Sequence, residues 1–287
     1  MIVVTGATGK LGGLVVRGLL TRLPAVQIGV SVRHPEAASA LSARGVRVRH
    51  GDFADPQSLR EAFAGATRLL IISSNASAYG GDPIAQHRAA IDAAKQVGVR
   101  RLFYTSHGGA SESSALAPMK THARTEAILS ESGLAWTALR NGFYANAATR
   151  FLGDWRIGTV KSPIDGKVAW TAHRDLAEAT VELLAGEHTF DGPTPPLTAA
   201  EALSLSELAA IGSEIIGKPI DRQVVDDEQY RMALETQGLP PMLIEMTLGF
   251  YEASRRGEFS AVDPLLERLI GRRPTTMREV LQNTERG

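Results

Sequence analysis

Three glycines spaced three residues apart stand near the start of the chain, in the stretch "VVTGATGKLGG". Gly6, Gly9 and Gly12 follow an apolar run and precede a segment with helical periodicity. Glycines at such a turn allow a tight bend and let the backbone approach a pyrophosphate, whose charge meets the free N–H groups that begin the helix. The pattern predicts a dinucleotide-binding loop, with a plain strand-to-helix turn as the alternative. The loop residues are Gly6, Ala7, Thr8, Gly9, Lys10, Leu11 and Gly12.

A basic residue stands where the second predicted strand ends, in "VSVRHPE". In NAD-binding proteins an acidic residue at this place binds the ribose hydroxyls and repels a 2′-phosphate. Arg33 occupies the place here, and a guanidinium can form a forked, charge-assisted pair with that phosphate. We therefore predict NADP as the cofactor, with NADPH preferred over NADH and with His34 and Lys10 as secondary contacts. The alternative for Arg33 is a solvated loop cation.

Small or polar residues follow the remaining predicted strands. Ligands of open parallel sheets bind beyond the carboxyl ends of the strands, which selects these residues as candidates for ribose and nicotinamide contacts. Asp52, next to Phe53, follows the third strand and can accept a hydrogen bond from the adenine amine or cap a turn. For each candidate the alternative is an ordinary turn residue. The later candidates are Ser73, Ser74 and Asn75, then Thr105, Ser106 and His107, and then Asn141, Gly142, Phe143 and Tyr144.

The stretch "MKTHARTEAIL", residues 119–129, lies where a short-chain-type reductase carries a Tyr-x-x-x-Lys pair, and this chain has Pro118 and His122 instead. Hydride addition to a ketone gives an alkoxide, whose conjugate acid has a pKa near that of water, ~15.7. Addition to a quinone gives a phenolate-like anion whose acid has a pKa nearer ~10. Because the two pKa values differ by about 6 units, the anion formed from the quinone needs roughly 8 kcal/mol less stabilisation. A conjugated acceptor can therefore be reduced without a tuned tyrosine acid.

Short apolar runs alternate with helical patterns through the first half of the chain, which is typical of βαβ units. We expect an α/β fold, a Rossmann-type doubly wound parallel sheet over residues 1–150, and a smaller, mostly helical domain over 151–287 from which some segments return to the sheet. Asp55-Pro56 and Asp82-Pro83 are expected to begin helices, and Thr276 to Glu279 to form a capping box. The expected strands are 2–4, 26–32, 46–49, 69–72, 102–104 and 136–139; the later helices are 174–184, 205–216, 226–236 and 241–256.

The composition excludes several classes of partner and site. Lys plus Arg and Asp plus Glu each number 31, so nothing favours nucleic acid or an anionic membrane surface. The chain has no cysteine, which excludes disulfides, zinc-thiolate sites and a cysteine nucleophile, and we expect no metal site. No secretory signal and no apolar run of about 20 residues is present. We expect a soluble, cytoplasmic protein.

Taken together, "VTGATGKLG", "VRHGDF", "LLIISSNAS", "YTS", "HARTE" and "LRNGFY" resemble, in order and spacing, the NmrA-like group of atypical short-chain dehydrogenase/reductases, and within it the quinone, triphenylmethane-dye and azo-dye reductases. The resemblance implies an NADPH-binding Rossmann domain and a small C-terminal domain, with the acceptor between them. Gly6 to Leu11 and Arg33 would hold the adenosine end of the cofactor. His122 and Glu126 match a His-x-x-x-Glu helix of the group, whereas "TSHGGA" replaces bulkier apolar residues.

These patterns favour a reductase that passes a hydride from NADPH to a quinone or a similar aromatic acceptor. In that reaction His122 would orient the nicotinamide ribose or the acceptor, and Tyr144 would close the site or lend its hydroxyl. The alternative is a non-catalytic NADP-binding sensor that signals through a partner, for which "LPPMLIEMTLGFY" at 239–251 offers an apolar patch. A sugar-nucleotide epimerase is disfavoured because it depends on the missing pair. A homodimer is compatible with the sequence.

Overall fold

A seven-stranded parallel sheet forms the centre of the first of two compact units. The computed structural model describes residues 1–188 and 190–284. All six predicted strands are present, with ends shifted by up to three residues, and a seventh, β10, lies outside the predicted strand ranges. The strands are β1 (Ile2–Thr5), β2 (Ile28–Val32), β3 (Arg47–His50), β4 (Arg68–Ile71), β5 (Arg101–His107), β6 (Ala135–Asn141) and β10 (Gly192–Pro193).

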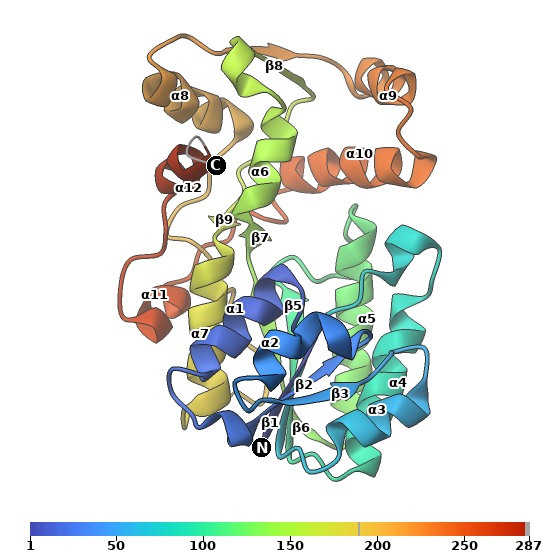
Figure 1. Cartoon of the computed structure of the whole chain (residues 1–287). Coiled ribbons are helices and arrows are strands. Elements are labelled where there is room, and N and C mark those ends of the chain that lie inside the picture. The colour runs from blue at the N-terminus through green and yellow to red at the C-terminus, as the bar shows by residue number, and fades with distance from the viewer. Residues whose placement is uncertain (189, 285–287) are drawn as a thin grey trace. The chain divides into compact units, whose positions relative to one another are not determined.

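The strand order is β10-β6-β5-β4-β1-β2-β3, which is the doubly wound Rossmann order with one added edge strand. The order reverses between β1 and β4, and ligands of such sheets bind beyond the carboxyl ends of the strands at that point. Helices α1 (Lys10–Leu19) and α7 (His173–Ala185) lie on one side of the sheet (Figure 1). Helices α3 (Pro56–Phe63), α4 (Pro83–Gln96) and α5 (Ala117–Glu131) lie on the other. The fold predicted from the sequence is confirmed.

Alternation along the strands explains how both sides of the sheet are covered. Val3, Ile71, Leu102 and Tyr104 pack into the buried core that α3, α4 and α5 share. Val4, Leu70 and Phe103, which alternate with them, are also fully buried, and in a strand such neighbours point to the opposite side, where α1 and α7 lie. The sheet therefore needs apolar residues at consecutive positions, as the short apolar runs of the sequence indicate.

The predicted helix starts are confirmed at two aspartates. The carboxylate of Asp55 accepts hydrogen bonds from the N–H groups of Gln57 and Ser58, and Asp82 does the same for Ile84 and Ala85. Proline follows each aspartate and removes an N–H group that would have no partner in the first turn.

The two units are not consecutive in the sequence. The first contains Met1–His107, Thr121–Arg140 and His173–Pro195, and the second contains Gly108–Lys120, Asn141–Ala172 and the chain from Pro196. Helix α7 and strand β10 follow residue 150 in the sequence but belong to the first unit, whereas residues 108–120 precede it and belong to the second. A methyl group at Gly18 of α1 would lie 2.8 Å from a methyl of Val181, so α7 packs closely on α1. Arg68 also donates a 2.6 Å hydrogen bond to the carbonyl of Leu184.

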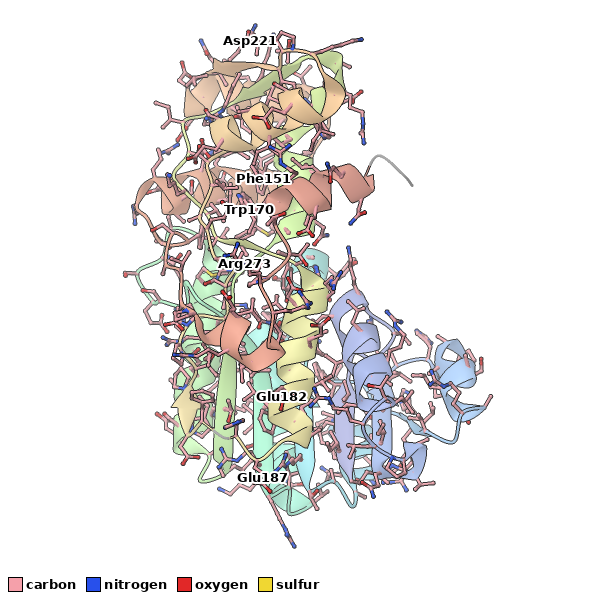
Figure 2. The ribbon with its side chains drawn as sticks, turned by 90° about the vertical axis from the view of Figure 1, so that its left-hand side faces the viewer. Phe151, Trp170, Glu182, Glu187, Asp221 and Arg273 are labelled. Carbon is pink, nitrogen blue, oxygen red and sulfur yellow. The ribbon has the colours of Figure 1, made fainter. Side chains whose placement is uncertain are left out.

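The second unit is mostly helical and has an aromatic core. Phe151 and Trp170, labelled in Figure 2, have ring centroids 6.2 Å apart, and Phe250 stacks on Phe151 at 3.9 Å. The predicted capping box is confirmed, since Thr276 and Glu279 exchange hydrogen bonds with each other's N–H groups. The helices are α6 (Ala145–Leu152), α8 (Leu205–Ile216), α9 (Asp227–Thr236), α10 (Pro241–Arg255), α11 (Leu265–Ile270) and α12 (Met277–Thr284). The strands are β7 (Phe143–Tyr144), β8 (Thr159–Ser162), β9 (Trp170–Thr171) and β11 (Asp221–Val224).

Within the described ranges, none of the helices has both the length and the apolar character that crossing a membrane requires.

Candidate cofactor and reaction site

The glycine loop between β1 and α1 has the geometry of a phosphate cradle. Gly6 adopts a positive φ of 59°, and a methyl group at Gly12 would lie 2.3 Å from the Gly6 carbonyl oxygen. Gly9 is the N-cap of α1, and no side chain of the described residues caps that turn. The first N–H groups of α1 are thus not covered by a side chain, and the positive end of the helix dipole points the same way. These residues fit the pyrophosphate of a dinucleotide.

Residues at the carboxyl ends of β2 and β3 lie side by side, because Val32 pairs with His50 in the parallel register. Arg33 is exposed, and its carbonyl lies 3.0 Å from the His50 Nδ1. The Nδ1 atom of His34 lies 3.3 Å from the carboxylate Oε1 of Glu36. The side chain of Asp52 accepts a 2.9 Å hydrogen bond from the Ala54 N–H, which is the turn-capping role that the sequence left open.

Phe53 is half-buried and packs against the core of the first unit. Lys10 is exposed, and its charge contributes to lowering the pKa of His173 to about 4, although burial of the imidazole is the larger cause. The predicted secondary phosphate contact at Lys10 therefore lies next to a histidine that is neutral at pH 7.

The loop after β4 is held by three side chains from three different elements. Its consecutive N–H groups at residues 72, 73 and 74 each donate to a side chain, so the loop has no free amide at these positions to bind a phosphate. Asn75 is exposed and begins a short 3₁₀ turn. The three bonds are Ile72 N to Thr5 Oγ1 at 2.9 Å, Ser73 N to Thr105 Oγ1 at 2.8 Å, and Ser74 N to His87 Nε2 at 2.8 Å.

This clamped loop and the glycine loop are neighbours in the first unit. A methyl group at Gly6 would lie 3.2 Å from the Cβ of Ile72, so the two segments approach closely. The Ser73 hydroxyl lies 3.3 Å from the Thr105 hydroxyl, and the Ser74 hydroxyl lies 2.5 Å from Gln86 Oε1. The predicted residues Gly6, Ser73, Ser74 and Thr105 therefore gather at one place.

His87 was not predicted as a site residue, although it holds the loop. A backbone N–H can only donate, so Nε2 of His87 must be the accepting nitrogen and Nδ1 carries the hydrogen. Nδ1 then donates to Thr125 Oγ1 at 2.9 Å, and that hydroxyl donates to the Thr121 carbonyl. Burial, with the nearby His122, lowers the pKa of His87 to about 3, and Asp82 opposes this in part. The sequence does carry a signal, because His87 falls in the apolar stripe of α4 with Ala90, Ile91 and Ala94.

Ser106 and Glu126 form part of a buried polar network. The Ser106 hydroxyl donates to Glu126 at 2.6 Å, and the guanidinium of Arg140 binds both oxygens of that carboxylate, at 3.1 Å and 2.7 Å. These hydrogen bonds and the ion pair offset the cost of burying the carboxylate. The network links β5, α5 and β6, and the Ser106 hydroxyl is engaged in it.

His122 contacts a tyrosine that was not predicted. The Tyr104 hydroxyl lies 2.8 Å from His122 Nδ1, and the His107 ring stacks over the His122 ring with centroids 6.3 Å apart. Burial lowers the pKa of His122 to about 4. His122 is therefore neutral at pH 7 and can donate or accept one hydrogen bond at each nitrogen, but it carries no acidic proton.

The segment Asn141 to Tyr144 belongs to the second unit. The side chain of Asn141 is buried, and neither amide atom has a well-formed hydrogen bond within the described part of the chain, although the amide lowers the pKa of Tyr144. Burial of that phenol is the larger effect and raises its pKa. A methyl at Gly142 would lie 2.3 Å from the Thr171 hydroxyl, and Phe143 packs edge-on against Trp170. An Asn141 amide without a good partner suits a ligand that offers both a donor and an acceptor.

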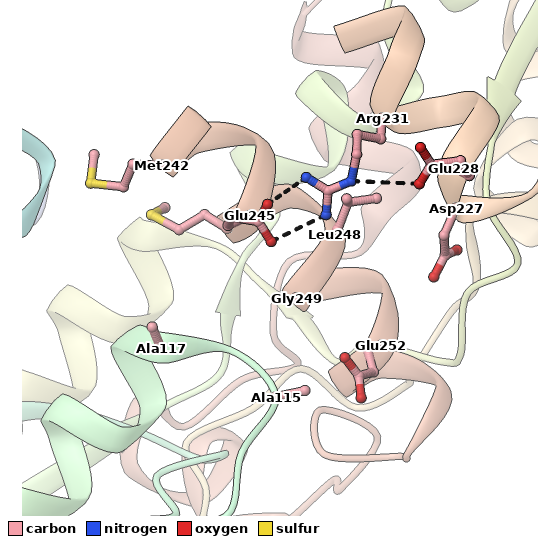
Figure 3. Close-up of a pocket in the computed structure, with 11 residues that line it drawn as sticks. Ala115, Ala117, Asp227, Glu228, Arg231, Met242, Glu245, Leu248, Gly249 and Glu252 are labelled. Atoms are coloured by element: carbon pink, nitrogen blue, oxygen red, sulfur yellow. Dashed lines mark hydrogen bonds and ion pairs between the residues drawn. The ribbon is translucent and has the colours of Figure 1, made fainter. Parts of the chain in front are cut away.

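A separate pocket of about 410 Å³ lies in the second unit, between α9, α10 and the start of α5 (Figure 3). Its carboxylates are paired with arginines: Glu245 and Glu228 with Arg231, and Asp227 with Arg255. None of the residues predicted to bind the cofactor or to take part in the reaction lines this pocket, although part of segment 239–251 does. We therefore do not include it in the candidate site.

Sequence comparison extends these observations to known proteins. The model of the NmrA-like family matches residues 1–281. Quinone oxidoreductase 2 of Escherichia coli is 35% identical over 284 residues, which cover 97% of this chain and 96% of that protein. The NAD(P)H azoreductase of Xenophilus azovorans is 29% identical over 282 residues, which cover 97% of this chain and 96% of that protein.

Structure comparison agrees. The crystal structure of the E. coli NADPH-dependent quinone oxidoreductase in complex with NADPH has a TM-score of 0.90 at 34% identity and covers 99% of this chain and 100% of that one. The Citrobacter triphenylmethane reductase in complex with NADP(H) has a TM-score of 0.89 at 34% identity and covers 99% of each chain. This chain belongs to the NmrA-like family.

Proposed function

We propose that this protein is an NADPH-dependent reductase that transfers a hydride to a quinone or a similar conjugated acceptor. One observation carries the proposal: the first unit places an uncapped glycine cradle directly beside a loop whose amides are already held by side chains. The cradle suits the pyrophosphate, and the held loop presents two serine hydroxyls at a fixed position. The relatives named above, which act with NADPH or NAD(P)H on quinones and dyes, support the same conclusion.

Each residue has a distinct part in this proposal. The N–H groups at the start of α1 bind the pyrophosphate, and Arg33 binds the 2′-phosphate. Ser73 and Ser74 orient the ribose and the nicotinamide, and bound NADPH supplies the hydride. The roles of Asn141 to Tyr144 by the nicotinamide stay predictions.

The proton of the reaction needs no dedicated acid. His122 is neutral at pH 7 because burial lowers its pKa to about 4, so it cannot act as an imidazolium acid. The hydroquinone anion is a phenolate, whose conjugate acid has a pKa near ~10, and water can protonate it at pH 7. His122→Ala is expected to lower kcat by about tenfold, the value of one hydrogen bond. Complete loss of hydride transfer with NADPH binding intact would show that an acid is missing from this account.

Much of the apolar segment that the sensor alternative invokes is packed within the second unit. In segment 239–251, Ile244, Leu248, Phe250 and Tyr251 are buried in the second unit, and Met242 is the large apolar residue of the segment that is exposed. Packing therefore accounts for the four buried apolar residues, whereas Met242 and Met246 line the pocket of Figure 3.

The deciding experiment mixes the purified protein with NADPH and a panel of quinones and cationic dyes and follows the absorbance of the reduced nicotinamide. We expect acceptor-dependent oxidation of NADPH. Tight NADPH binding without oxidation by any acceptor would instead support the sensor.

A further inference from the structure

We propose that Tyr104 is a positioning residue, whose hydroxyl fixes the His122 imidazole in the tautomer that carries its hydrogen on Nε2. His122 then acts as a neutral hydrogen-bond donor toward the acceptor oxygen. The tautomer follows from the contact alone, whereas the catalytic use of Nε2–H rests on the proposed function.

The contact is a buried hydrogen bond between two groups of known preference. The Tyr104 hydroxyl lies 2.8 Å from His122 Nδ1, the side chain of Tyr104 is fully buried, and the two rings are tilted by 52°. A phenol is a better donor than acceptor, because its oxygen lone pair is delocalised into the ring. The unprotonated ring nitrogen of imidazole is a strong acceptor. The Tyr104 O–H therefore donates to Nδ1, and a neutral ring whose Nδ1 accepts must carry its hydrogen on Nε2.

A second imidazole beside Tyr104 provides the opposite case. The His87 ring lies edge-on to the Tyr104 ring, with centroids 5.1 Å apart. Its Nε2 accepts from the Ser74 N–H at 2.8 Å, so its hydrogen is on Nδ1. Tyr104 thus lies between two neutral histidines whose hydrogens are on different nitrogens. In His122 the Tyr104 hydroxyl donates to Nδ1, so the hydrogen is on Nε2; in His87 the Ser74 N–H donates to Nε2, so the hydrogen is on Nδ1.

The hydrogen on Nε2 matches what the proposed reaction needs. As the hydride arrives with its electron pair, the C–H bond of the reduced nicotinamide breaks, an O–H bond forms at one quinone oxygen, and the other quinone oxygen gains the negative charge. A fixed N–H donor stabilises that oxygen anion without giving up its own proton. The proton that completes the hydroquinone then comes from water. The use of a neutral imidazole as an electrophile has a precedent in triosephosphate isomerase.

The tautomer can be read directly by NMR. We would label the full chain with ¹⁵N-histidine, record long-range ¹H–¹⁵N correlations at pH 7, and assign the signals with His122→Gln and His87→Gln. We expect a neutral Nε2–H ring for His122 and a neutral Nδ1–H ring for His87, which serves as the internal reference. A His122 signal from the Nδ1–H form, or from an imidazolium, would overturn the proposal. This experiment needs no substrate, so its result is independent of whether the proposed function holds.

Tyr104→Phe tests whether the tautomer matters for turnover. The variant keeps the ring but removes the donor, so His122 should become a mixture of both tautomers in the same spectrum. We expect kcat to fall about three- to tenfold, with the KM for NADPH changed by less than about twofold. Tyr230→Phe is the matched control in the second unit and should leave both constants unchanged. An unchanged kcat in Tyr104→Phe, together with mixed tautomers, would overturn the catalytic half of the proposal.

Discussion

The loops after β1 and β4 are neighbours but differ in how their backbone N–H groups are used. The β1 loop leaves its amides uncapped by side chains and uses glycines to bring them close to a ligand. The β4 loop has its amides at residues 72, 73 and 74 bound by Thr5, Thr105 and His87, and it presents hydroxyl groups instead. In the proposed function, the free backbone donors of the first loop would bind a phosphate, and the side chains of the second loop would contact the ribose or the nicotinamide amide.

Gly12→Ala should distort the loop after β1 and cause the largest loss of NADPH affinity among these variants. The added methyl would lie 2.3 Å from the Gly6 carbonyl oxygen, so the loop backbone must move. We expect the free energy of unfolding to fall by about 1–3 kcal/mol and NADPH affinity to fall by about 100-fold or more. Urea unfolding and fluorescence titration measure the two effects. Gly13→Ala is the control, since its methyl would lie 3.2 Å from the nearest atom; similar losses in both variants would contradict the cradle.

Arg33→Asp should change the affinity for NADPH and the affinity for NADH by different amounts. Removing the guanidinium and adding a carboxylate should weaken NADPH by about 30-fold while NADH changes little, because NADH lacks the 2′-phosphate. Titrations of both cofactors test this. Arg44→Asp makes the same charge change before β3, at the amino end of the strand, and should affect the two cofactors equally. If Arg33→Asp weakens the binding of NADPH and NADH equally, Arg33 does not bind the 2′-phosphate.

His87→Phe should loosen the loop after β4 and leave the glycine loop after β1 unchanged. The phenyl ring can still pack against Tyr104, but the Ser74 N–H loses its acceptor. We expect a loss of about 1–3 kcal/mol in the free energy of unfolding and a rise of about tenfold in the Kd for NADPH. His87→Gln offers a new acceptor and should recover part of both losses. If Phe and Gln behave alike, the hydrogen bond to Ser74 does not hold the loop.

The pH dependence of stability should report the buried imidazole of His87 as a difference of one proton in its slope. Its pKa falls from 6.5 to about 3 on folding, mainly by burial, so below pH 6.5 the unfolded chain binds a proton that the folded chain does not. Stability is therefore full above that pH and falls as the pH is lowered toward 3, by up to about 1.4 kcal/mol per pH unit. Urea unfolding between pH 4.5 and 7.5 should show a slope that His87→Gln reduces by one proton. A slope identical in the two proteins would mean that His87 is not buried in neutral form.

Local patterns explain why the β1 loop could be read from the sequence. The glycines, the strand before them and the helix after them are contiguous. Gly6 has a positive φ, and Gly12 allows a close approach that a side chain would block. The same holds for the aspartate caps of α3 and α4 and for the capping box of α12, where all partners lie within three residues. Arg33 was found by its distance along the chain from the glycines.

The β4 loop could be recognised only in part. Ser73 and Ser74 were predicted, but their supports come from β1, β5 and α4, which are distant in the sequence. The same is true of Glu126, whose partner Arg140 lies on β6, and of β10, which is two residues long and has no periodicity. No spacing rule predicts a hydrogen bond between residues that only the folded sheet brings together.

The sequence alone predicts six of the seven strands of the sheet, the alternation of strands and helices along the chain, the glycine cradle and the loss of the Tyr-x-x-x-Lys pair, because all of these depend on local periodicity and spacing. Only the tertiary structure decided which nitrogen of His87 and His122 carries the hydrogen, and which loop amides remain free for a ligand. A protonation state depends on the burial and the partner of each group, and both exist only after strands and helices far apart in the chain have packed together.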